Sequence, residues 1–117
     1  MKTILIIDDD SAVLQLLAAK LRDKFSIHTT TDPRSAIPQM KSQRIDLVLC
    51  DLDMPAMNGS EAAKRIRAEF PGMPIVFLTG LVTVREAKDG AIKGERVMAK
   101  SAPISELVAC IQSVIGT

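Results

Sequence analysis

The sequence is poor in the features that mark several common classes of protein. Its 117 residues include only two cysteines and one histidine, and no apolar run approaches the ~18 residues needed to span a membrane. Lysine and arginine number 15 and aspartate and glutamate 14, so the formal net charge of +1 gives no general attraction to nucleic acid or to an anionic membrane. We therefore expect neither direct nucleic-acid binding nor membrane binding, and any function must come from a local site.

The few cysteine and histidine residues have ordinary structural explanations. Cys50 lies in a predicted strand and Cys110 in a predicted helix, which favours free buried thiols over a disulfide or a metal pair. His28 lies in a predicted edge strand without a second metal ligand at a recognisable spacing, so we expect a surface residue. The chain runs directly into the apolar segment Ile4–Ile7 without a cleavable signal pattern, and we expect a cytoplasmic protein.

The apolar patterns that are present predict one α/β domain over residues 1–117. Five short runs are typical of strands: Ile4–Ile7, Ser26–Thr30, Leu47–Cys50, Ile75–Leu78 and Val97–Ala99. Helical spacing predicts five helices, namely one with Val13, Leu14, Leu16, Leu17 and Leu21 on its inner face, one beginning at Asp32-Pro33, and those at Ser60–Phe70, Val84–Asp89 and Ile104–Ile115. Their strict alternation predicts a parallel sheet with helices on both faces. The sequence stops just after the last predicted helix, so we expect no output domain within it.

Individual residues predict several helix boundaries. Asp10 or Ser11 can cap the first helix, and Asp32 followed by Pro33 is typical of a helix start. Pro38 falls inside the same helical pattern, where it removes a backbone donor and should kink or shorten the second helix.

Polar side chains follow four of the five predicted strands. They are Asp8 and Asp9 after the first strand, Asp51 after the third, Thr79 after the fourth and Lys100 after the fifth. The carboxyl ends of parallel strands meet at one edge of a sheet, where α/β proteins bind ligands, so we expect these groups to converge. Each has a simpler explanation by itself, because acids and Thr79 can cap helices and Lys100 can be solvated.

The converging groups indicate phosphoryl chemistry. Three neighbouring carboxylates repel one another and invite a hard divalent cation, for which oxygen ligands suit Mg²⁺. An aspartate carboxylate can also attack phosphorus and form an aspartyl-phosphate. The metal, the ammonium of Lys100 and the donors near Thr79 and Gly80 could then balance the three phosphoryl oxygens.

Four motifs together resemble the receiver domain of two-component response regulators across the whole chain. They are Ile4-Leu5-Ile6-Ile7-Asp8-Asp9, then Asp51-Leu52-Asp53-Met54-Pro55 with Met57-Asn58-Gly59, then Leu78-Thr79-Gly80, and Lys100. The resemblance implies a flavodoxin-like, CheY-like sheet of order 2-1-3-4-5. It also implies that Asp51 is the phosphoacceptor. Asp9, Asp51 and the backbone carbonyl of Asp53 would bind Mg²⁺ or Mn²⁺, while Asp8 would hold a metal-bound water.

The resemblance further implies the partners of such a domain. A histidine kinase or a histidine phosphotransfer protein would supply the phosphoryl group. The signal would pass to a downstream protein or output domain through the predicted helix Val84–Asp89, the strand Val97–Ala99 and the closing helix. The chain would then be a signalling module rather than a metabolic enzyme, with only its own phosphorylation and dephosphorylation as chemistry.

The sequence departs from the family pattern near Lys100. Val97 replaces the aromatic residue usual three positions before the lysine, so an aromatic switch is not available. Ser101 replaces the usual proline, and because a cis bond before serine costs more than about 3 kcal/mol, we predict a trans bond there. Leu81 is apolar where the family controls access of hydrolytic water, which predicts slow dephosphorylation.

Two other functions fit part of the pattern. A receiver-like interaction domain that is never phosphorylated would agree with the changes at Val97 and Ser101. An aspartate-nucleophile phosphatase of the haloacid-dehalogenase type would agree with Asp51-Leu52-Asp53, but that motif normally follows the first strand of a longer chain with a cap.

Overall fold

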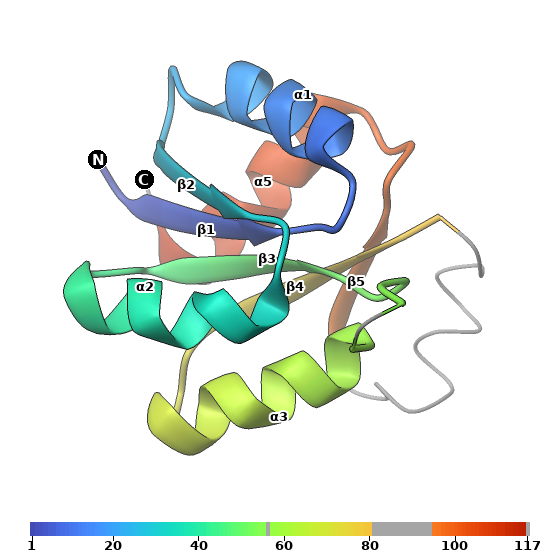
Figure 1. The fold of residues 1–117 in the computed structure, drawn as a ribbon. Coiled ribbons are helices and arrows are strands. Elements are labelled where there is room, and N and C mark those ends of the chain that lie inside the picture. The colour runs from blue at the N-terminus through green and yellow to red at the C-terminus, as the bar shows by residue number, and fades with distance from the viewer. Residues whose placement is uncertain (56, 81–94, 117) are drawn as a thin grey trace.

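A computed structural model describes residues 1–55, 57–80 and 95–116. Five parallel strands form one sheet in the order β2-β1-β3-β4-β5, as predicted (Figure 1). The strands are β1 (Thr3–Ile7), β2 (Ser26–Thr30), β3 (Leu47–Asp51), β4 (Ile75–Thr79) and β5 (Arg96–Ala99). This order is that of the flavodoxin-like fold, and it places β1 and β3 at the centre, where the order of the strands reverses.

The helices cover both faces of the sheet (Figure 1). They are α1 (Ser11–Leu21), α2 (Ala36–Ser42), α3 (Gly59–Glu69) and α5 (Ile104–Ile115). α1 and α5 pack on one face, and α2 and α3 on the other. The predicted helix Val84–Asp89 and Leu81 lie outside the described residues. In the part of the chain that the structure describes, no helix has both the length and the apolar character to cross a membrane.

The strands divide the core into two apolar layers because alternate side chains point to opposite faces. In β1, Leu5 and Ile7 pack toward α2 and α3, whereas Ile4 and Ile6 pack toward α1 and α5. Four residues of β1 and all of β3 are buried, as expected for central parallel strands covered by helices on both sides. The edge strand β2 is only partly buried, and its His28 is half-buried.

One prediction about the first helix is wrong. Leu16 was expected on the inner face of α1, but its side chain is 55% exposed. The buried stripe of α1 is formed by Leu14, Ala18 and Leu21. At about 100° per residue, Leu16 lies roughly 200° around the helix from Leu14, so both residues cannot face the sheet.

The second helix is short, as predicted, and Pro38 lies close to its start. Asp32 caps a 3₁₀ turn at Pro33–Ser35, and α2 then begins at Ala36 and has seven residues. Pro38 is therefore in the first turn of α2, where a backbone N–H has no partner within the helix and its loss costs little.

The remaining local predictions are largely confirmed. Asp10 caps α1 as one of the two predicted candidates. Both cysteines are free thiols, although Cys110 is only half-buried. The described residues contain no cis peptide bond, so the bond before Ser101 is trans.

Candidate functional site

An acidic pocket lies at the carboxyl edge of the central strands. Asp8 follows β1 and Asp51 ends β3, and each is only 1% exposed, whereas the neighbouring Asp9 is exposed. One carboxylate oxygen from each of these three residues lies within 4.8 Å of the other two. The structure thus brings together the three acids that the sequence predicted to converge.

Lys100 completes the pocket from the end of β5. Its Nζ lies 3.1 Å from Asp8 Oδ2 and 3.1 Å from Asp51 Oδ1. The backbone N–H of Lys100 donates to the carbonyl of Thr79 at 2.9 Å, which fixes the residue beside the end of β4. The alternative that Lys100 is simply a solvated lysine is therefore wrong.

Burial controls the electrostatics of this pocket. It raises the pKa of Asp51 to about 6, because the loss of solvation and the nearby charge of Asp8 outweigh the hydrogen bond from Asp53 and the contacts with Lys100. Burial alone would lower the pKa of Lys100, but its contacts with Asp8 and Asp51 outweigh that effect and raise it. Lys100 therefore remains protonated as an internal counter-ion.

One oxygen of Asp51 is left without a partner. Asp51 Oδ1 accepts a hydrogen bond from the Asp53 backbone N–H at 3.0 Å, but the buried Oδ2 has no hydrogen-bond partner among the described residues. An orphaned buried carboxylate oxygen is costly unless something binds it. The pocket consists of oxygen donors with excess negative charge, so it fits a hard divalent cation, and Asp51 Oδ2 is free to bind a ligand or attack one.

Gly59 allows α3 to begin directly behind Asp51. A Cβ atom at this position would lie 2.6 Å from the Asp51 carbonyl oxygen and 2.9 Å from Leu52 Cα, which is closer than real side chains approach. The preceding residue, Asn58, caps α3 by accepting a hydrogen bond from the Glu61 N–H at 2.9 Å. The Asn-Gly pair of the motif therefore ends the loop and packs the helix against the strand that carries Asp51.

Asp53 has a side-chain contact that the sequence did not predict. Its Oδ2 accepts hydrogen bonds from Thr79 Oγ1 at 3.3 Å and from the Gly80 N–H at 3.0 Å. The sequence assigned only the backbone carbonyl of Asp53 a role. An acid two residues beyond the strand end was the available signal, but the direction of its side chain depends on the loop.

Two residues near Lys100, Val97 and Ser101, depart from the family pattern, and the structure shows where each of them lies. Val97 is buried in the apolar layer beneath α2 and α3, and Ser101 is exposed.

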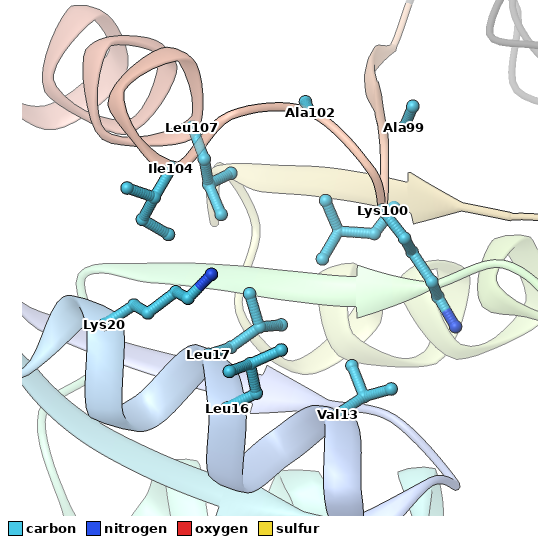
Figure 2. A pocket seen from close by; sticks show the side chains of 10 residues that line it. Val13, Leu16, Leu17, Lys20, Ala99, Lys100, Ala102, Ile104 and Leu107 are labelled. Carbon is cyan, nitrogen blue, oxygen red and sulfur yellow. The ribbon is translucent and has the colours of Figure 1, made fainter.

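On the opposite face of the sheet an apolar hollow of about 130 Å³ separates α1 from the loop before α5 (Figure 2). Figure 2 shows Leu17 of α1 on one side of this hollow and Ile104 on the other. Lys100 lines both the hollow and the acidic pocket.

The sequence pattern described as the response regulator receiver domain matches residues 4–112. The chain belongs to this family. The receiver domain of two-component response regulators is thus its functional class, and its acidic pocket fits the phosphoacceptor site of that class. The family assignment also disfavours the phosphatase alternative.

Solved structures of receiver domains share the whole fold. A response regulator receiver domain protein from Clostridium thermocellum is 25% identical, with a TM-score of 0.86, and the match covers 98% of this chain and 94% of that one. The chemotaxis protein CheY4 from Vibrio cholerae is 26% identical, with a TM-score of 0.85, and the match covers 97% and 98% of the two chains.

A similar protein of known sequence is longer than this receiver domain. The probable transcriptional regulatory protein TcrX of Mycobacterium tuberculosis is 30% identical over 115 residues, which are 97% of this chain and 49% of that protein. The receiver domain thus spans about half the length of this curated relative.

Proposed function

We propose that Asp51 accepts a phosphoryl group and that the domain works as a phosphorylation-dependent signalling switch. The observation that carries this proposal is the buried Asp51 Oδ2, which has no hydrogen-bond partner among the described residues, while the other oxygen of the same carboxylate, Oδ1, lies 3.1 Å from the ammonium of Lys100. An oxygen atom in this position can attack phosphorus without first breaking a hydrogen bond.

Asp8, Asp9, Asp51 and the backbone carbonyl of Asp53 are the residues that would hold Mg²⁺ or Mn²⁺. The carboxylate spacing within 4.8 Å supports this assignment for the three acids. The bound cation would neutralise charge on the phosphoryl oxygens as they enter the pocket. Asp8 is buried and tied to Lys100, which suits a role in holding a metal-bound water.

Lys100 and Thr79 orient the phosphoryl group. The ammonium already lies 3.1 Å from Asp51 Oδ1, so it can contact a phosphoryl oxygen after only a small movement. Two further hydrogen-bond donors, the Thr79 hydroxyl and the Gly80 N–H, lie at the end of β4. Positioned charges of this kind account for most of the catalysis in phosphoryl transfer.

The phosphoryl donor in this proposal is a histidine kinase or a histidine phosphotransfer protein. Asp51 attacks the phosphorus and the P–N bond breaks. The electron pair of that bond stays on the donor's ring nitrogen, and the histidine leaves as neutral imidazole because its other ring nitrogen carries a proton. The output surface consists of β5 and α5 together with the predicted helix Val84–Asp89. A shift from about 1:99 to 99:1 between two states needs roughly 5.5 kcal/mol of differential binding, which a multiply charged group can supply. We also propose that residues 1–117 form a single domain and that the protein is located in the cytoplasm.

Intact-mass measurement after incubation with acetyl phosphate and Mg²⁺ tests the proposal. We expect one phosphate adduct on the wild type, none on Asp51→Asn, and none on either protein when EDTA replaces Mg²⁺. Asp23→Asn, which changes an exposed acid, is the matched control and should be phosphorylated normally. An adduct that survives Asp51→Asn would place the site elsewhere. A wild type that binds Mg²⁺ but never gains phosphate would instead be an interaction domain.

A further inference from the structure

Asp53 connects the candidate nucleophile to the donors at the end of β4. Its backbone N–H donates to Asp51 Oδ1 at 3.0 Å, and its carboxylate accepts from the Thr79 hydroxyl at 3.3 Å and the Gly80 N–H at 3.0 Å. Thr79 is only 1% exposed, whereas Asp53 is half-buried. One residue therefore contacts both walls of the pocket.

We infer that the Asp53 carboxylate is an internal competitor of the phosphoryl group for the Thr79 hydroxyl and the Gly80 N–H. The inference that a phosphoryl group displaces it rests on the proposed function, whereas the contact itself does not. In the unphosphorylated protein these two donors form hydrogen bonds to an oxygen of the Asp53 carboxylate. In the phosphorylated protein they would form hydrogen bonds to an oxygen of the phosphoryl group instead. Asp53 is then a positioning residue that favours the unphosphorylated state.

The competition follows from the chemistry of the groups. A hydroxyl and a backbone N–H each carry one hydrogen, so a donor that is fully engaged with Asp53 cannot also donate fully to a phosphoryl oxygen. The carboxylate and the phosphoryl group are both anions, so placing them at the same donors adds like-charge repulsion. Phosphorylation of Asp51 must therefore move either the Asp53 side chain or the end of β4.

A simpler role is that Asp53 only ties the β3 loop to β4 and stabilises the fold. The two roles differ in what happens when the carboxylate is removed. A tie would affect stability alone, whereas a competitor must also weaken the binding of a phosphoryl group. Two variants separate charge from hydrogen bonding: Asp53→Asn keeps an acceptor oxygen without the charge, and Asp53→Ala removes both.

The first measurement uses the unphosphorylated protein without metal, so it is independent of the proposed function. Amide hydrogen exchange and the NMR shift of the Gly80 N–H report whether this exposed residue is hydrogen-bonded. We expect protection in the wild type, partial protection in Asp53→Asn and about tenfold faster exchange in Asp53→Ala. Exchange at the wild-type rate in Asp53→Ala would overturn the inference.

The second measurement is the affinity for beryllofluoride, a stable mimic of an aspartyl-phosphate, at saturating Mg²⁺ for each variant. We expect Asp53→Ala to bind about tenfold more tightly than Asp53→Asn, and Asp53→Asn to bind at least as tightly as the wild type. Equal affinity of the two variants would overturn the competition, because both lack the charge and only one lacks the acceptor. If no protein binds beryllofluoride, the proposed function and the displacement both fail, and Gly80 exchange still decides whether the contact exists.

Discussion

Replacing Asp51 with asparagine should stabilise the fold while removing the proposed phosphoacceptor. The Asp51 side chain is 1% exposed, and burial raises its pKa from 3.8 to about 6. About two pKa units at 1.36 kcal/mol each give an upper bound of about 3 kcal/mol for the cost of ionised Asp51 in the native state. Asparagine has the same shape without the charge, and its oxygen can still accept from the Asp53 N–H. We expect Asp51→Asn to raise the free energy of unfolding by about 1–3 kcal/mol at pH 7.5.

The stability difference should depend on pH in one direction. Above about pH 6 native Asp51 is ionised and destabilising. Between about pH 6 and 3.8 the native state binds a proton that the unfolded state does not, so the wild type becomes more stable relative to Asp51→Asn as the pH falls. The gap between the two proteins should close near pH 4.

Urea unfolding in EDTA at pH 7.5 and at pH 4.5 measures this difference directly. Mg²⁺ at about 100 times its Kd should stabilise the wild type by about 2.7 kcal/mol and Asp51→Asn much less. The exposed Asp23→Asn variant controls for the general effect of removing a negative charge. An Asp51→Asn protein no more stable than the wild type at pH 7.5 would refute the argument that burial strains this carboxylate.

Three further predictions concern the loop and the thiols. Gly59→Ala should lower the free energy of unfolding by roughly 1–3 kcal/mol and slow phosphorylation of Asp51 by acetyl phosphate, because the new Cβ meets the Asp51 carbonyl oxygen at 2.6 Å; wild-type values in both assays would contradict the close contact. Asn58→Ala should cost about 1 kcal/mol in urea unfolding through loss of the α3 cap, and an unchanged midpoint would mean that the cap contributes nothing. A thiol reagent at pH 8 should label half-buried Cys110 and leave Cys50 unlabelled in the native protein, because burial and the nearby charges of Asp51 and Asp8 raise the pKa of Cys50 to about 12; rapid labelling of both thiols would argue against this burial.

The fold could be predicted because its strands and helices leave different periodic patterns. β1, β3 and β4 are short continuous apolar runs, and such runs are buried on both faces only when helices cover a parallel sheet. The polar edge strand β2 was recognisable for the opposite reason. The convergence of Asp8, Asp51 and Lys100 then followed from the geometry of parallel strands.

The errors came where local pattern does not determine side-chain direction. α1 carries more apolar residues than one face can bury, so the sequence did not exclude Leu16 from the core. Asp53 lies in an irregular loop, where neither a period of 2 nor of 3.6 applies, and its contact with Gly80 depends on the loop path. The predicted helix Val84–Asp89 lies outside the described residues and stays a prediction.

The close packing at Gly59 makes the two sides of the pocket mechanically unequal. On one side the backbone of α3 at Gly59 packs directly against the backbone of β3 at Asp51, with no side chain between them. Segments packed this closely cannot move toward each other. On the other side the contacts are the ion pair of the long Lys100 side chain and the hydrogen bonds that the Asp53 carboxylate accepts from Thr79 and Gly80, which rotation about side-chain single bonds can rearrange. If Asp51 is phosphorylated as proposed, we therefore expect the added charge to be accommodated by the Asp53 side chain and by β4 and β5 rather than by α3, because Gly59 leaves no room for α3 to move toward β3.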